Sequence, residues 1–152
     1  MIQNDLHLPS RRKHCDERRR ESAPLGLHPV GASLDEVRGL LTVQVRQEQE
    51  AQGYGDTELM KLCCVQLFNA GSLEDVLLIW QAKSASMDAD CSIDVQLLCG
   101  SGLAQTKAYL SCLCLPEADA ALQRLAQCEA AGDFEDFSAE TYSALHAAYY
   151  AP

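Results

Sequence analysis

The stretch LMKLCCVQLFNAGSLEDVLLIW, residues 59–80, decides the fold of this chain. An apolar helical pattern extends from about Thr57 to Ala70. Gly71 follows it, at the position where a helix C-terminus favours a left-handed residue. Ser72 then precedes a second apolar run, so it can cap a second helix. The sequence therefore predicts two helices joined by a tight turn, with the second one buried at the centre of the domain.

Helical patterns continue on both sides of this hairpin. Ser33 with Glu36 three residues later has the spacing of a capping box. Asp56 and Ser138 stand where they can cap two further helices, each followed by apolar residues on one helical face. The sequence therefore predicts an all-α fold, with one helical domain over residues 33–152.

Two later segments of the chain resemble the sequence around the central turn. Residues 70–76 align with residues 131–137 at an offset of 61, and residues 65–73 align with residues 95–103 at an offset of 30. Such even spacing is typical of helical repeats, in which each hairpin buries its apolar face against the next. We therefore expect antiparallel hairpins stacked as a short solenoid-like domain, or an irregular bundle.

A second interpretation leads to an α/β fold. Residues 93–97 alternate apolar and polar side chains as a strand does, so residues 93–99 could form a strand and residues 76–79 a neighbouring one. The turn Gly100-Ser101-Gly102 would then follow a strand and precede a helix, which is the setting of phosphate-binding turns. This alternative predicts a small enzyme or a nucleotide or phosphate binder.

Charge divides the chain into two parts. Residues 1–32 carry six Lys and Arg against four Asp and Glu, a net charge of +2, so residues 33–152 carry −12 of the total of −10. The basic part contains Arg11-Arg12-Lys13, Arg18-Arg19-Arg20 and several prolines, which predicts a disordered leader and linker. The acidic body should repel nucleic acid and attract a basic protein surface. No apolar run approaches the ~20 residues of a membrane span, so we expect a cytoplasmic protein without a membrane segment.

Side chains with catalytic potential form no recognisable motif. The eight cysteines include no C-x-x-C pair, and most lie at apolar positions of helices, as reduced core thiols do. His146 is the one histidine outside residues 1–32, and we expect it on the surface. The sequence therefore assigns no catalytic residue, no metal site and no cofactor, and it favours a protein that is not an enzyme.

These observations favour a non-enzymatic module that binds a basic protein. An immunity-like or antitoxin-like role would suit a small acidic chain, and a wide apolar helix face would also suit a subunit of a larger assembly. The candidate interaction residues lie at matching repeat positions, in the acid pair after the central turn or at a hairpin end: Gln66, Asn69, Glu74, Asp75, Trp80 and Gln96.

Overall fold

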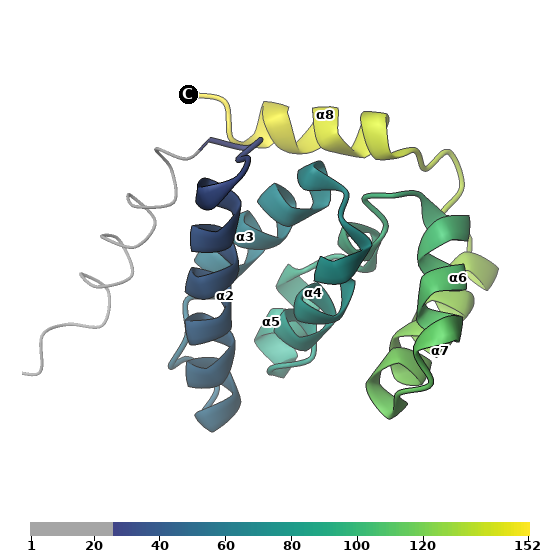
Figure 1. Ribbon diagram of the computed structural model, residues 1–152, viewed down its shortest axis with the longest axis horizontal. Coiled ribbons are helices and arrows are strands. Elements are labelled where there is room, and N and C mark those ends of the chain that lie inside the picture. The colour runs from purple at the N-terminus through teal and green to yellow at the C-terminus, as the bar shows by residue number, and fades with distance from the viewer. Residues whose placement is uncertain (1–25) are drawn as a thin grey trace, which may run out of the picture.

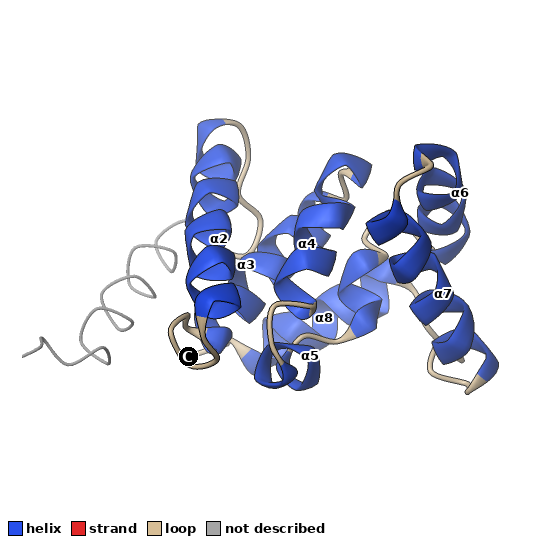
Figure 2. Ribbon diagram, turned by 90° about the horizontal axis from the view of Figure 1, so that it is seen from below, coloured by secondary structure: helices blue, strands red, loops and turns tan. Residues whose placement is uncertain are grey.

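The computed structural model describes residues 26–152, and most of the predicted basic leader lies outside them (Figure 1). Helices and loops make up the described part, which contains no strand (Figure 2). The prediction of an all-α fold is therefore confirmed. Within residues 26–152, seven α-helices and two 3-10 helices follow one another as α2 (Ala32–Glu50), α3 (Thr57–Ala70), η2 (Leu73–Asp75), α4 (Val76–Lys83), α5 (Met87–Ser92), η3 (Val95–Leu98), α6 (Leu103–Leu113), α7 (Pro116–Ala130) and α8 (Ala139–Tyr149).

Two of the predicted helix caps are present. The Asp56 carboxylate accepts hydrogen bonds from the backbone N–H groups of Glu58 at 3.0 Å and Leu59 at 3.2 Å, at the start of α3. The Ser138 hydroxyl accepts one from the N–H of Thr141 at 3.1 Å, at the start of α8. All three bonds satisfy donors that the first turn of a helix would otherwise leave unpaired.

The cap predicted at Ser33 is wrong. Helix α2 already begins at Ala32, and its N-cap is Gly31, whose φ of 58° is left-handed. The Gly31 carbonyl accepts hydrogen bonds from the N–H groups of Leu34 and Asp35. A glycine can take this backbone conformation without a Cβ clash, so the helix starts two residues earlier than a side-chain cap at Ser33 requires. The side chain of Ser72 likewise caps no helix, because the chain forms η2 there before α4.

The segment predicted as either helix or strand is a single helical turn. Val95–Leu98 forms the 3-10 helix η3, and three of its four side chains are buried. The α/β alternative, with strands near 76–79 and 93–99, is wrong, because 76–79 belongs to α4 and no strand occurs in residues 26–152. The middle copy of the repeat thus begins with one turn where the first copy has all of α3. The arrangement of the chain as stacked hairpins of equal size stays a prediction.

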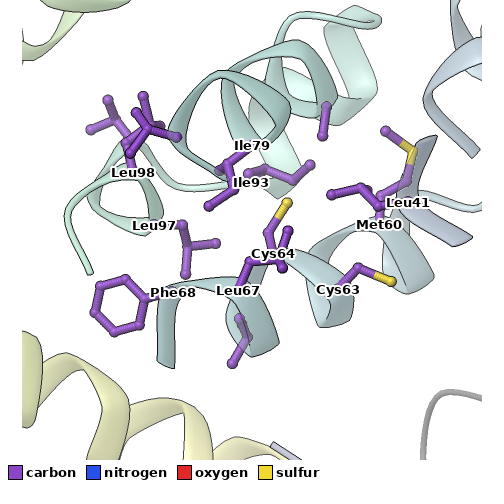
Figure 3. Packing of buried hydrophobic residues seen from close by; sticks show 14 of the residues in the cluster. Leu41, Met60, Cys63, Cys64, Leu67, Phe68, Ile79, Ile93, Leu97 and Leu98 are labelled. Atoms are coloured by element: carbon purple, nitrogen blue, oxygen red, sulfur yellow. The ribbon is translucent and has the colours of Figure 1, made fainter. Parts of the chain in front are cut away.

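The core is aliphatic and is centred on α3 and α4. Met60, Cys63, Cys64 and Leu67 of α3 are at most 1% exposed, and they pack with residues of η3 and neighbouring helices (Figure 3). Helix α4 lies against α2, α3, α5, α7 and η3, as expected for the central helix. No helix within residues 26–152 has the combination of length and apolar character needed to cross a membrane.

Three of the seven described cysteines are buried in this core, and three are exposed. Burial raises the pKa of the Cys99 thiol to about 12. It also raises the pKa of Cys64 well above its ordinary value. These thiols are therefore protonated at neutral pH and pack as small apolar groups, as the sequence predicted for the buried set.

The buried carboxylate of Glu48 holds the C-terminal end of α2 in place. Glu48 is 1% exposed. One of its oxygens accepts hydrogen bonds from the N–H groups of Gly53 at 2.6 Å and Gly55 at 3.2 Å. The other accepts one from the hydroxyl of Ser86 at 2.7 Å, and Ser86 is the N-cap of α5. Glu48 thus connects α2, the loop before α3 and the start of α5.

Candidate interaction groove at helix α8

Helix α8 lies across the ends of the other helices, at the top of Figure 1. Aromatic contacts attach it. The ring of Tyr142 meets Phe68 of α3 edge-on, with centroids 5.5 Å apart, and meets Phe137 at 5.7 Å. Phe137 in turn meets Phe134 at 5.3 Å. Edge-to-face pairs of this kind contribute about 0.5–1.5 kcal/mol each beyond the area they bury. The attachment of α8 therefore differs from the aliphatic core beneath it.

Three adjoining hollows surround the first turn of α8, with volumes of about 170, 210 and 430 Å³. We call them together the α8 groove. The first and third share Phe137 and Ser138, and the second and third share Gly100, Ala139 and Glu140. The remaining lining residues are Phe68, Asn69, Gln96, Ser101, Gly102, Leu103, Asp133, Phe134, Glu135, Asp136, Thr141, Tyr142, Ser143 and Leu145.

Four carboxylates line this groove and face solvent, and we call them the rim carboxylates: Asp133, Glu135, Asp136 and Glu140. None of them forms an ion pair within residues 26–152. The ion pairs of the described residues involve Arg38, Lys83, Lys107 and Arg124, whose carboxylate partners all lie elsewhere. The groove thus presents negative charge that no described cation neutralises.

A fifth carboxylate lies beside the groove. Asp94 accepts a hydrogen bond from the hydroxyl of Tyr142 at 2.7 Å. Burial of the phenol, together with this bond and the nearby charge of Asp94, raises the pKa of Tyr142. Tyr142 therefore stays a neutral donor at physiological pH and fixes Asp94 next to the rim carboxylates.

The loop before α8 is held in one conformation by local contacts. The side-chain amide of Gln96 donates to the backbone carbonyl of Asp133 at 3.0 Å. Asp136 has a φ of 59°, in the left-handed region. Asp and Asn tolerate this region better than most residues, because their short polar side chains can hydrogen-bond locally. The loop that carries the rim carboxylates is therefore hydrogen-bonded to η3 at Asp133 and ends at Ser138, the N-cap of α8.

The glycine turn that suggested phosphate binding has a packing role. A Cβ on Gly100 would lie 2.3 Å from the backbone oxygen of Phe68, so only glycine fits against the end of α3. The hydroxyl of Ser101 donates to the backbone carbonyl of Gly71 in the central turn. Gly102 has a φ of 97° and leads directly into α6. Close approach and left-handed backbone therefore account for both glycines.

Asn69 and Gln96, two of the six candidate interaction residues, line the groove. The Asn69 amide donates to the carbonyl of Leu27 at 2.8 Å, and its oxygen accepts from the hydroxyl of Ser143 at 2.7 Å. Gln66 is fully buried below them and donates to the carbonyl of Gly26 at 2.6 Å. Both side chains of α3 therefore hold the start of the described chain.

The other three candidates lie away from the groove. Asp75 is 4% exposed and accepts two hydrogen bonds from the Arg38 guanidinium, at 2.7 and 2.9 Å. This bidentate contact raises the pKa of Arg38 and joins η2 to α2. Glu74 is exposed next to it. Trp80 is half-buried, with the Arg124 guanidinium 5.9 Å from its ring centroid, between α4 and α7.

The sequence interpretation missed the residues that define the groove. The run DFEDFSAE, residues 133–140, places four acids and two phenylalanines in eight positions. Two of these acids, Glu135 and Asp136, fall within the segment that aligns with the central turn, but they precede α8, which begins at Ala139. The alternation of acidic and aromatic residues in a non-helical stretch is the signal that would have identified the groove.

His146 occupies a different position from the one predicted. It is 7% exposed and the one buried residue of α8, so the expected surface position is wrong. Its ring meets Tyr142 edge-on at 4.7 Å, and its Nε2 atom has no hydrogen-bond partner among the described residues. Burial, and secondarily the charge of Lys61, lower the pKa of His146, while Asp94 acts in the opposite direction.

We expect stability to decrease as the pH falls below about 6.5, the ordinary pKa of histidine. The unfolded chain binds a proton at His146 more readily than the folded chain, so the stability present above that pH is lost on acidification. Urea denaturation at pH 7.5 and 5.5 should show a larger loss for the native chain than for His146→Phe. A His28→Gln variant, altered at an exposed histidine, should behave like the native chain. Equal losses for the native chain and His146→Phe would contradict the assignment.

The groove combines carboxylates with apolar side chains. Carboxylates of this kind can accept hydrogen bonds from Lys and Arg side chains, and the aromatic and aliphatic side chains offer apolar area. Within residues 26–152, no cluster of three or more His, Cys, Asp or Glu side chains could hold a metal ion. Comparison of the chain with family models, with curated proteins and with solved structures finds no match in any of the three.

Proposed function

We propose that this chain is a non-enzymatic interaction module whose α8 groove binds a basic segment of a partner protein. The observation that carries the proposal is the set of rim carboxylates, which line an apolar hollow without a cationic partner in the described chain. A cytoplasmic protein that masks a basic partner, as immunity proteins and antitoxins do, would use such a surface.

The floor of the groove adds apolar contact to this charge. Leu145 is 62% exposed at one end, and Phe134, Phe137 and Leu103 line the remainder half-buried. Covering such side chains contributes about 25 cal/mol per Å² of apolar surface. The rim charges contribute less each, because exposed ion pairs are worth about 0.2–1 kcal/mol. A segment with both basic and apolar side chains therefore fits the groove better than a purely basic one.

The test uses a fluorescein-labelled peptide in which Lys-Arg-Leu is repeated four times, with binding followed by fluorescence anisotropy. The triple variant Asp133→Asn, Asp136→Asn, Glu140→Gln should bind about tenfold more weakly than the native chain, since three pairs at about 0.5 kcal/mol each amount to that factor. Asn at position 136 keeps the tolerance for the left-handed backbone.

A matched control removes the same charge elsewhere. The exposed residues Glu36, Glu50 and Asp88 lie on α2 and α5, away from the groove. Changing them to the corresponding amides should leave the affinity within about twofold of the native value at about 0.1 M salt, because charges beyond a Debye length of ~10 Å are then screened. Equal loss in the two triple variants would show that only net charge matters, and would contradict a binding site at the groove.

A further inference from the structure

The first described residues of the chain lie next to one end of the α8 groove, the end lined by Asn69. The carbonyl of Leu27 accepts a hydrogen bond from Asn69 at 2.8 Å, and Asn69 lines the groove together with Ser143 and Gly100. The neighbouring carbonyl of Gly26 is bound by Gln66 at 2.6 Å. Gly26 and Leu27, the first described residues, are therefore held beside the groove.

The sequence immediately before this point carries the complementary charge. Residues 11–20 read RRKHCDERRR, with six basic side chains against two acidic ones, a net charge of +4. We call them the basic segment. The groove offers four rim carboxylates, with Asp94 beside them. The described residues leave this charge uncompensated, and the nearest dense source of positive charge along the chain is the basic segment.

The residues between the basic segment and Gly26 form a tether that is long enough for the basic segment to reach the groove. Arg20 stands six residues before Gly26 and Arg11 fifteen. At about 3.4 Å per residue, these separations allow spans of up to about 20 Å and 50 Å. A tether of this length also holds the segment at an effective concentration in the millimolar range with respect to the groove. Even an interaction that is weak between separate molecules is then largely formed within one chain.

We propose that the basic segment of this chain occupies its own α8 groove and competes there with the basic partner. This inference rests on the proposed function, and it adds an intramolecular competitor for the same site. A partner must displace the segment, so partner binding is weaker than the groove alone would give. For a segment that binds with a dissociation constant of about 100 μM, a millimolar effective concentration weakens partner binding about tenfold.

The experiment compares two variants of the full chain with the native chain, using the Lys-Arg-Leu peptide as probe. The first variant carries Arg18→Gln, Arg19→Gln and Arg20→Gln, which removes positive charge from the segment. The second carries Lys at the same three positions, which keeps the charge. The Gln variant should bind the peptide about tenfold more tightly than the native chain, and the Lys variant should bind like the native chain.

Amide chemical shifts give a second, direct measurement. In ¹⁵N-labelled full-length protein, the Gln variant should shift the amides of residues 133–140 and of Gly100 relative to the native chain, and the Lys variant should shift them much less. The perturbation should not depend on protein concentration, because the contact is within one chain.

The outcomes separate the two proposals. Equal peptide affinity of the native chain and the Gln variant would overturn occupancy of the groove by the basic segment, and would leave the groove as a site for a basic partner. Shifts that grow with protein concentration would overturn it as well, since they would show binding between copies. Absence of peptide binding by all three chains would overturn the proposed function together with this inference.

Discussion

Replacing Glu48 by Ala should destabilise the fold by about 3 kcal/mol, one of the two largest effects of a single substitution that we expect in this protein. The change leaves the N–H groups of Gly53 and Gly55 and the hydroxyl of Ser86 without their acceptor. Each bond to a charged group is worth about 1.5–3 kcal/mol, but partial access of water to the freed groups reduces the total. Urea denaturation followed by far-UV circular dichroism measures the loss.

Two further variants make this expectation specific. Glu48→Gln keeps one acceptor oxygen and should cost about half as much, because one side of the carboxylate contact survives. Glu50→Ala changes an exposed glutamate on the same helix and should stay within about 0.5 kcal/mol of the native chain. A loss below about 1 kcal/mol for Glu48→Ala would mean that the carboxylate does not organise the loop between α2 and α3.

Replacing Gly100 by Ala should cost about 2–3 kcal/mol, the usual range for forcing a methyl group into a packed site. The added Cβ would lie 2.3 Å from the carbonyl oxygen of Phe68, and that oxygen belongs to backbone, so it cannot move as a side chain would. The turn must withdraw from α3, which also weakens the bond between Ser101 and the carbonyl of Gly71. Thermal denaturation measures the effect.

Gly39→Ala is the matched control for this prediction. Gly39 lies within α2, and a Cβ there would meet nothing within 4 Å. Because alanine is the better helix former, this variant should gain about 0.5–1 kcal/mol. Since Gly100 also lines two of the hollows of the α8 groove, Gly100→Ala should in addition weaken peptide binding, whereas Gly39→Ala should not. Stabilisation by both substitutions would contradict the close contact at Gly100.

The sequence predicted those parts of the fold that depend on local chemistry. The bounds of α3 follow from the Asp56 cap and from Gly71, both of which act on their immediate neighbours. Residues 93–99 were ambiguous because the positions that a strand buries on one face, Ile93, Val95 and Leu97, are also buried when the chain makes one 3-10 turn. Tertiary packing against α3 and α4 decides between these outcomes, and periodicity within seven residues does not.

The site depended on contacts between distant residues, which is why the sequence identified little of it. Asn69 and Gln96 were among the candidate interaction residues, and they line the groove through bonds to Ser143 and Asp133 that no local pattern specifies. Asp75 was predicted as a candidate interaction residue after the central turn, whereas it is buried and bound by Arg38, which lies 37 residues earlier. A charged residue on a predicted helix face says nothing about which partner reaches it across the fold.

The contacts of Asn69 have a mechanical consequence. The side chain of Asn69, in the last turn of α3, is hydrogen-bonded to Leu27 near the start of the described chain. It is also hydrogen-bonded to Ser143 in α8, the last helix. A force that pulls the two ends apart would therefore load this amide before it reaches the aliphatic interior. The same amide therefore couples the attachment of the entering residues to the attachment of α8.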